Sequence, residues 1–214
     1  MYDLHIHSNF SDGKASIDEI AKKAKEMGLK VIAIVDHSLE HKRGLNERKA
    51  RKRELEIEKA KSKYDIEILS GIECGICANG EILKPKLDFD LILVAIHEVL
   101  PSDEYYRRIK LCLRKNEIDI LSHFHSQMFC SLNGRIETED LEVLDLLKEN
   151  DVALELNSLH MAPPLETLEL AAKVRVKYSI GSDSHSLERV GDVAWCWKMA
   201  KKYLRKSKIF LKKL

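Results

Sequence analysis

Short, continuous runs of aliphatic residues recur along the chain, separated by longer segments with a helical repeat of apolar positions. Continuous runs of this length are typical of parallel strands that are buried on both faces. The alternation of such strands with helices predicts an α/β fold with a parallel sheet. The predicted strands lie at about residues 2–6, 31–36, 66–72, 91–96, 118–122, 152–156 and 178–182.

The segments between these runs carry helix signals. Ser16 and Glu19 form a capping box, and the apolar stripe that follows ends at Gly28. Thr138 is the expected N-cap of a later helix. Further helices are predicted at about residues 45–63, 103–115, 138–149, 164–175 and 193–204.

The segment between Glu73 and Leu91 interrupts this alternation. It has no helical stripe, and Asn79-Gly80 predicts a small hairpin there. Because strands and helices otherwise alternate, we expect a closed or nearly closed barrel of seven strands. An open, doubly wound sheet is the alternative, although the chain lacks the Gly-x-Gly-x-x-Gly and phosphate-loop motifs of nucleotide-binding folds.

The composition indicates the general class of protein but not the reaction that it catalyses. The 214 residues, 44% of them hydrophobic, suffice for one core, so we expect a single domain over residues 1–214. The chain has no apolar run long enough to span a membrane and no signal sequence at its start, which favours a cytoplasmic protein. Its five scattered cysteines are expected to be reduced and structural.

The formal net charge of +1 hides two basic stretches, at residues 42–63 and 198–213. Their plainer interpretation is a solvated helix face. The alternative is a surface that attracts phosphate groups, which would suit a nucleic-acid substrate. Both interpretations stay open at the level of sequence.

Histidine and acidic side chains recur at or just after the ends of the predicted strands. Imidazole and carboxylate groups are ligands of zinc, manganese and iron. In a His-x-His segment of a strand, both side chains point to one face, because strand side chains alternate. Barrel enzymes place their active sites at the C-terminal ends of the strands, so distant segments are predicted to build one polynuclear metal site. The residues concerned are His5, His7, Asp36, His37, Glu73, His97, His123, His125, Asp183 and His185.

These residues, in this order, resemble the motifs of the PHP (polymerase and histidinol phosphatase) superfamily. The resemblance implies a distorted, TIM-like (β/α)7 barrel with its metal site at the C-terminal ends of the strands. It also implies two or three divalent metal ions, usually zinc, manganese or iron. The matching segments are His5-Ile6-His7-Ser8-Asn9-Phe10-Ser11-Asp12-Gly13, Asp36-His37, Gly71-Ile72-Glu73 and Gly181-Ser182-Asp183-Ser184-His185, with His97 and His123 between them.

Carried over residue by residue, the resemblance implies three groups of metal ligands. Many members of the family have histidine where this chain has Asp12, so the third ion is expected to bind weakly or to be a harder metal such as manganese. The first group is His5, His7, Glu73 and Asp183; the second is Glu73, His97 and His123; the third is Asp12, His37 and His185.

Metal-activated water is the predicted nucleophile. Two ions about 3.5–4 Å apart, bridged by Glu73, would lower the pKa of a shared water, so that hydroxide attacks phosphorus. Glu73, Asp183 and His185 are therefore the expected catalytic residues. No nucleophilic side chain is required, in agreement with the lack of a Gly-x-Ser-x-Gly motif.

These features together predict a metal-dependent phosphoesterase, a hydrolase that acts on a small phosphomonoester at a di- or trinuclear site. One alternative is a nuclease or nucleotide phosphatase, which the basic stretches would serve. A further alternative is a non-catalytic accessory module that keeps its metal for stability. The sequence indicates neither the physiological substrate nor the oligomeric state.

Asn157, His125 and Arg189 are the candidates for substrate contact. Asn157 ends a predicted strand that supplies no metal ligand, and His125 follows a ligand histidine at a spacing of two. Arg189 lies in the loop after the last ligand-bearing strand, where a guanidinium could clamp a phosphate. The alternatives are a supporting role behind the ligands for His125 and a surface position for Arg189. His41 and His160 end no predicted strand and are not assigned.

Overall fold

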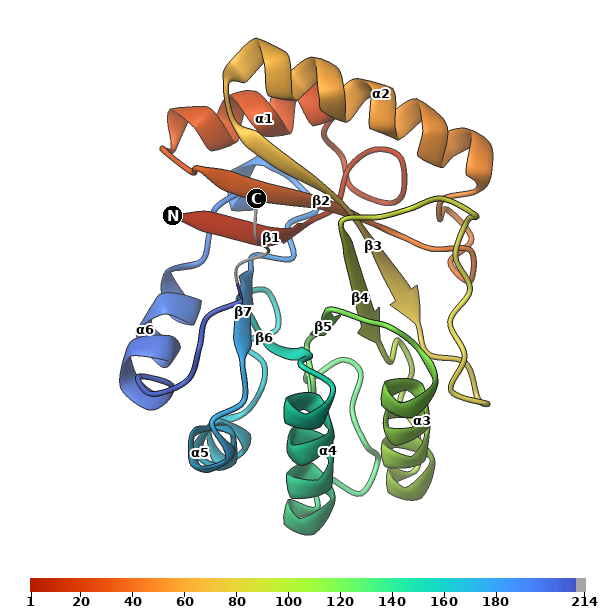
Figure 1. Cartoon of the computed structure of the whole chain (residues 1–214), viewed down its shortest axis with the longest axis vertical. Helices are drawn as coiled ribbons and strands as arrows, with labels where there is room; N and C mark the ends of the chain where they lie inside the picture. The colour runs from red at the N-terminus through yellow and green to blue at the C-terminus, as the bar shows by residue number, and fades with distance from the viewer. Residues whose placement is uncertain (211–214) are drawn as a thin grey trace.

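The computed structural model describes residues 1–210, in which seven parallel strands form one sheet in sequence order (Figure 1). All but one of the connections between consecutive strands contain a helix, which confirms the predicted α/β alternation. Residues 211–213 of the second basic stretch lie outside the described residues. The strands are β1 (Tyr2–Ile6), β2 (Val31–His37), β3 (Glu67–Gly75), β4 (Leu91–Ala95), β5 (Ile120–Leu121), β6 (Ala153–Asn157) and β7 (Tyr178–Gly181).

The first and last strands meet, which nearly closes the sheet into a barrel. Just beyond the end of β7, Asp183 N donates a hydrogen bond to His5 O at 2.8 Å. His7 N donates in turn to Ser184 O at 2.9 Å. This contact confirms the distorted (β/α)7 barrel, because the edge strands of an open, doubly wound sheet would lie apart. It also brings two histidines from the start of the chain beside an aspartate near its end.

In the described part of the chain, six α-helices cover the outer face of the sheet. α1 and α2 lie along one side of the barrel, and α3 to α6 follow around the rest (Figure 1). None of the helices within residues 1–210 combines the length and the apolar composition needed to cross a membrane. The helices are α1 (Ile17–Glu26), α2 (Glu47–Tyr64), α3 (Ser102–Lys115), α4 (Glu137–Glu149), α5 (Leu165–Val174) and α6 (Ala194–Tyr203), with a short 3-10 helix, η1 (Leu187–Arg189), before α6.

The N-terminal ends of α1 and α4 differ in how they are capped. α1 has the predicted capping box, in which Ser16 Oγ accepts from Glu19 N and Glu19 accepts from Ser16 N. α4 begins before Thr138, and its N-cap is Ile136, which offers no side-chain cap. Instead, the Tyr106 hydroxyl on α3 accepts from Ile136 N at 2.9 Å. The prediction of Thr138 as N-cap is therefore wrong, because a contact from another helix replaces the local cap.

Asn79 and Gly80 form a turn, but residues 76–90 contain no strand. The φ angle of Gly80 is +77°, a conformation that favours glycine. The end of α3 covers this turn: Lys115 Nζ donates to Asn79 O at 2.9 Å. Asn116 Nδ2 donates to Gly80 O at 2.8 Å. The predicted hairpin is wrong, because side chains from a helix, and not a partner strand, satisfy the carbonyl groups of the turn.

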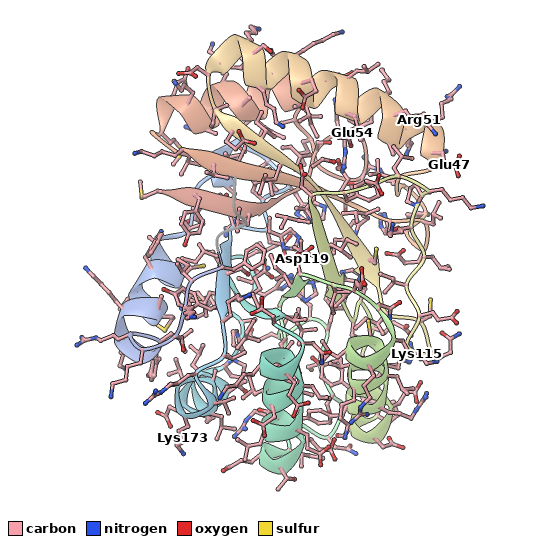
Figure 2. All side chains as sticks on the ribbon, in the orientation of Figure 1. Glu47, Arg51, Glu54, Lys115, Asp119 and Lys173 are labelled. Atoms are coloured by element: carbon pink, nitrogen blue, oxygen red, sulfur yellow. The ribbon has the colours of Figure 1, made fainter. Side chains whose placement is uncertain are left out.

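The first basic stretch is not uniformly exposed. Glu47 and Arg51 project from α2 away from the sheet, whereas Glu54 points toward it (Figure 2). Arg53 is buried with no exposed surface, and its Nη1 lies 3.3 Å from Asp36 Oδ2. The Arg53 guanidinium therefore belongs to the interior, and the solvated face that the stretch predicts is made by its other basic residues.

Candidate metal centre

The predicted metal ligands converge on one cavity at the C-terminal ends of the strands. The cavity has a volume of about 530 Å³. His5 lies directly behind its lining, with no exposed surface. The structure thus brings together every residue that the resemblance implied as a ligand. Those that line the cavity are His7, Asp12, His37, Glu73, His97, His123, Asp183 and His185.

Glu73, on β3, is the centre of the arrangement. Its Oε1 lies 3.2 Å from His123 Nε2 and 3.5 Å from His97 Nε2. Its Oε2 lies 3.1 Å from His37 Nδ1 and 3.7 Å from His7 Nε2. The carboxylate is 1% exposed and has imidazoles beside both oxygens, and His5 Nε2 also lies 3.6 Å from Oε1. It is therefore placed to be shared between two cations, as the sequence predicted.

The first cluster comes from the two strands that close the barrel. His5 and His7 point to the same face, and their Nε2 atoms lie 3.0 Å apart. Asp183 Oδ1 lies 3.4 Å from His7 Nε2 and 3.8 Å from His5 Nε2. All three side chains are buried. The arrangement agrees with the alternation of side chains along a strand, which placed the two histidines together.

The third cluster surrounds Asp12. Asp12 Oδ2 lies 3.5 Å from His37 Nε2 and 3.4 Å from His185 Nε2. Its other oxygen, Oδ1, lies 3.6 Å from His7 Nδ1. These four residues form one group of potential ligands, so His7 presents one ring nitrogen to the first cluster and the other to the third.

Beside the second cluster lies a histidine that the sequence did not assign. Glu73, His97 and His123 form a group of potential ligands, as the resemblance implied. His160 Nε2 lies 3.4 Å from Asp183 Oδ2, and these two residues form a further group with His123. His160 stands in the turn after β6, beyond a strand that supplies no other ligand. Its position three residues past the strand end was its only sequence signal.

The donor set of this centre fits divalent metal ions. In each cluster, one ligand atom of every member lies within 4.8 Å of the others. Nδ1 of His7 and Nδ1 of His37 are buried, and neither makes a well-aligned hydrogen bond among the described residues, although Glu73 Oε2 lies 3.1 Å from His37 Nδ1. Buried nitrogens in this state are costly unless a bound group satisfies them. Mixed imidazole and carboxylate donors suit zinc, manganese or iron.

The carboxylates of the centre stay ionised at neutral pH. Burial opposes the ionisation of Glu73 and Asp183, but the surrounding histidines hold the pKa of both well below its usual range. Burial also opposes the ionisation of Asp12, but hydrogen bonds from two histidines lower its pKa. Burial lowers the pKa of His7 to about 4, which leaves this imidazole neutral. Although burial opposes it, the same carboxylates raise the pKa of His5 and His185, and that of His37 to about 9, so an incoming cation would displace protons from these imidazoles.

Asp36 holds the loop that carries Asp12. Its Oδ1 accepts from Ser8 N at 2.9 Å and from Ser11 Oγ at 2.6 Å, and Arg53 pairs with its Oδ2. Gly13 closes the loop at a point where a Cβ would lie 2.3 Å from a backbone oxygen, so only glycine fits. The buried Asp36–Arg53 pair therefore positions the third cluster without contacting it.

Glu155 supports two of the ligands from behind and was missed at the level of sequence. Its Oε1 accepts from His5 Nδ1 at 2.7 Å, and its Oε2 accepts from His123 N at 2.9 Å. The side chain is buried. A signal was present: Glu155 is an acid inside an apolar strand, where an unpaired charge is rare.

Asn157 also holds the centre in place and does not line the cavity. Its Nδ2 donates to Asp183 Oδ2 and to Glu155 Oε2, both at 3.0 Å. Its Oδ1 accepts from His160 N at 3.0 Å. Period-two alternation along β6 puts this amide on the same face as Glu155. The structure therefore gives Asn157 contacts to candidate metal ligands, and its contact with substrate stays a prediction.

His125 points away from the cavity. Its Nε2 lies 2.8 Å from Asp140 Oδ1, beside Tyr106. β5 ends at Leu121, and His123 has a φ angle of +30°, so the two histidines do not share a strand. The side chains of His123 and His125 therefore do not point to the same face, as two residues of one strand would. His125 instead fixes the loop after β5 against α4, while its contact with substrate and its alternative role behind the ligands both stay predictions.

Arg189 is also outside the lining of the cavity. It lies in η1, and its Nη2 lies 3.2 Å from Asp192 Oδ2. This local ion pair agrees with the surface position that was its alternative. His41, which the sequence left unassigned, does line the cavity, with its ring centroid 4.5 Å from that of His37.

Comparison with known proteins identifies relatives over most of the chain. The family model described as PHP domain matches residues 3–159. The DNA polymerase/3'-5' exonuclease PolX of Bacillus subtilis (strain 168) is 28% identical over 201 residues, which cover 89% of this chain and 35% of that protein. A probable histidinol-phosphatase of Thermotoga maritima is 29% identical over 210 residues, which cover 89% of this chain and 87% of that protein. The chain thus spans about a third of the first relative and most of the second.

A solved structure has the same fold. The histidinol phosphate phosphatase of Lactococcus lactis subsp. lactis, complexed with zinc, L-histidinol and phosphate, superposes with a TM-score of 0.65 at 17% identity. The superposition covers 98% of this chain and 94% of that chain. It confirms the predicted TIM-like barrel. The motifs, the barrel and the match over residues 3–159 together show that this chain belongs to the PHP domain family of metal-dependent phosphoesterases.

Proposed function

We propose that this chain hydrolyses a small phosphomonoester at a site that holds two or three divalent metal ions. The observation that carries the proposal is the convergence of three ligand clusters, linked through Glu73, His7 and Asp183, on one cavity. The similarity to the probable histidinol-phosphatase of Thermotoga maritima, which extends over most of both chains, supports the same class of reaction.

Each group of ligands would hold one ion. Bound there, divalent ions would supply a water of lowered pKa and neutralise charge on the phosphoryl oxygens. Glu155 accepts the Nδ1 proton of His5, which leaves His5 Nε2 as the nitrogen that faces the cluster. The groups are His5, His7, Glu73 and Asp183 for the first ion, Glu73, His97 and His123 for the second, and Asp12, His37 and His185 for the third.

The size and the lining of the cavity support a small substrate. A volume of about 530 Å³ falls within the range of small-molecule sites. No lysine or arginine occurs among its lining residues in the described part of the chain. A single phosphoryl group would need only the metal centre, whereas a longer polyanion would find no cationic side chain inside the cavity.

A hydrolysis screen on protein reloaded with manganese, zinc or iron tests this function. We expect phosphate release from a pool of small phosphomonoesters, loss of release after chelation, and a fall of about 10³-fold in Asp183→Ala. A bound metal ion supplies several kcal/mol of transition-state stabilisation, which corresponds to a change of that size. Asp88→Ala, at an exposed aspartate, is the control and is expected to keep full activity. No release from any monoester would contradict the proposal.

The non-catalytic module makes a different prediction for the same samples. In that case Asp183→Ala would bind less metal and melt at a lower temperature, while the reloaded wild type would release no phosphate from any ester. Metal content and melting temperature, measured beside phosphate release, therefore separate a metal site that serves catalysis from one that serves stability alone.

Action on nucleic acid is the second candidate function, and a basic hollow beside the loop of Asp12 favours it. Arg48, in this hollow, forms no ion pair within residues 1–210, whereas Lys52 Nζ lies 3.8 Å from Glu56 Oε1. On α3, by contrast, Arg107, Arg108 and Lys110 all pair with glutamates. An arginine without an acidic partner is available to pair with a phosphate group. The hollow is lined by Asn9, Phe10, Arg48, Lys49, Lys52 and Glu56.

Charge reversal in the basic hollow tests the second candidate. The Arg48→Glu/Lys52→Glu variant is expected to weaken binding of labelled single-stranded DNA and to reduce the slope of log K against log salt by about 1.4. Each lost phosphate contact contributes about 0.7 to that slope. Fluorescence anisotropy at several salt concentrations measures both effects. Lys201→Glu/Lys202→Glu, on α6, is the matched control. The same loss in both variants would argue against a specific surface.

We also propose a cytoplasmic location and a single domain. All five cysteines are unpaired, which is typical of proteins in a reducing compartment. β7 pairs with β6 and contacts β1, so the segment after residue 159 completes the same barrel and supports the interpretation as one domain.

A further inference from the structure

The cavity of the metal centre has an apolar wall, formed by Met128, Phe129 and Leu159. Met128 and Phe129 belong to the loop after β5, and Leu159 belongs to the turn after β6. Met128 is 61% exposed and Leu159 is 38% exposed, so apolar surface faces water at the mouth of the cavity. Apolar surface gathered beside a few convergent polar groups is typical of a ligand site.

Phe129, in the first part of this wall, is positioned by the loop that carries the candidate metal ligand His123. Phe129 N donates to Ser126 Oγ at 3.0 Å, and Ser126 N donates to His123 O at 2.8 Å. The Phe129 ring lies edge-on to the His97 ring, with centroids 5.5 Å apart and planes at 83°. It also lies 6.0 Å from the His160 ring. The ring is thus placed by the same loop that places a ligand, next to the ions' expected positions.

The second part of the wall stands on a tight turn. Asn157 N donates to Ala162 O at 2.9 Å, and Ala162 N donates to Asn157 O at 3.2 Å. Ser158 N donates to Gly181 O at 3.0 Å, which ties the turn to the end of β7. Leu159 therefore projects from a backbone fixed at both ends. Two loops, each anchored beside a metal ligand, present one preformed apolar surface to the cavity.

Outside the apolar wall, few lining residues of the cavity are free to contact the leaving group of a substrate. Apart from the wall, the residues around the cavity are the potential metal ligands and His41. A sugar or a second phosphate would give up its hydration for contacts with methyl and phenyl groups, which is unfavourable. A flat apolar group would gain from the same contacts, and an aromatic ring can pack against Phe129.

From these contacts we infer that the preferred substrate is the phosphomonoester of an aromatic alcohol, with the ring of the leaving group against the apolar wall. The inference rests on the proposed function and deepens it. In the reaction, an oxygen of water forms the new bond to phosphorus, and the bond between phosphorus and the aryl oxygen breaks. The released aryl oxide takes up one proton of that water. The products are inorganic phosphate and the free phenol.

Paired substrates and paired variants test the inference. kcat/KM is measured for phenyl phosphate and for glycerol 3-phosphate, on manganese-loaded wild type and on Met128→Ser/Leu159→Ser. The ratio of variant to wild type is taken for each substrate separately, which removes the difference in intrinsic reactivity. We expect the value for phenyl phosphate to fall about tenfold further than the value for glycerol 3-phosphate, as for a lost apolar contact. Leu55→Ser/Leu165→Ser, at exposed leucines outside the cavity, is the control and is expected to shift neither value.

Inhibition by phosphonates repeats the comparison without bond cleavage. Phenylphosphonate is expected to bind the wild type at least about tenfold more tightly than methylphosphonate, and the Met128→Ser/Leu159→Ser variant is expected to lose that preference. Equal losses on both substrates, or no phosphonate preference in the wild type, would overturn the inference and leave the proposed function standing. Failure of the wild type to hydrolyse either ester would overturn the proposed function, and this inference with it.

Discussion

Glu73→Gln is expected to abolish phosphoester hydrolysis, with a fall in kcat/KM of about 10³-fold or more. The substitution keeps the shape of the side chain but removes the charge that two clusters share. Oε1 faces His97, His123 and His5, whereas Oε2 faces His37 and His7, so one change is expected to weaken two metal sites at once. A divalent ion contributes several kcal/mol to a phosphoryl-transfer transition state, which gives the magnitude.

The measurement combines kinetics with metal content. Purified protein is loaded with manganese or zinc, and bound metal is counted by mass spectrometry beside the rate of phosphate release. Glu67→Gln is the matched control, because Glu67 starts the same strand at the opposite end of the barrel and, within residues 1–210, forms an ion pair only with Lys61, at 3.7 Å. A Glu73→Gln variant that keeps its metal and its rate would remove Glu73 from the centre of the site.

Glu155→Gln is expected to lower zinc affinity by about 10–100-fold and to reduce kcat/KM with it. Glu155 does not line the cavity, so it acts by positioning. Its carboxylate accepts the proton on His5 Nδ1 and the backbone proton of His123, and thereby fixes ligands of two clusters. An amide would present a donor where an acceptor is needed, and supporting contacts of this kind carry effects of this size.

Zinc affinity, measured by competition with a chelator, separates positioning from general damage to the fold. Ser179→Ala is the control, because Ser179 is buried on β7 directly opposite Glu155 and its hydroxyl has no partner among the described residues. It is expected to change zinc affinity less than twofold. If both variants lose affinity alongside a similar drop in melting temperature, Glu155 serves the core and has no special role at the metal site.

The candidate metal ligands were predictable because of their positions at the ends of the predicted strands. The aliphatic runs marked seven strands, and the polar residues at their ends had to meet wherever parallel strands share an edge. Glu73, His97 and His123 lie far apart in sequence and form one group in the structure. The spacing of His5 and His7 predicted a shared face, and their Nε2 atoms lie 3.0 Å apart.

Two predictions that rested only on local sequence spacing differ from the structure. His125 follows His123 at the same spacing as His7 follows His5, but the strand ends before it and the chain turns toward Asp140. Thr138 has the chemistry of an N-cap, yet Tyr106 contacts the backbone ahead of it. In each case, a contact with a residue distant in sequence decided the local conformation.

The sequence by itself determined where the strands lie and that histidine and acidic residues gather at their ends, because burial and side-chain alternation are properties of a local segment. The barrel class and the groups of candidate metal ligands followed from the resemblance to the PHP motifs. The tertiary structure decided which residues support and complete that centre. His160 enters it from a turn, Glu155 holds two ligands from behind, and Leu159 helps to form an apolar wall. These roles depend on distances between loops that are set only when β1 and β7 meet and the barrel closes.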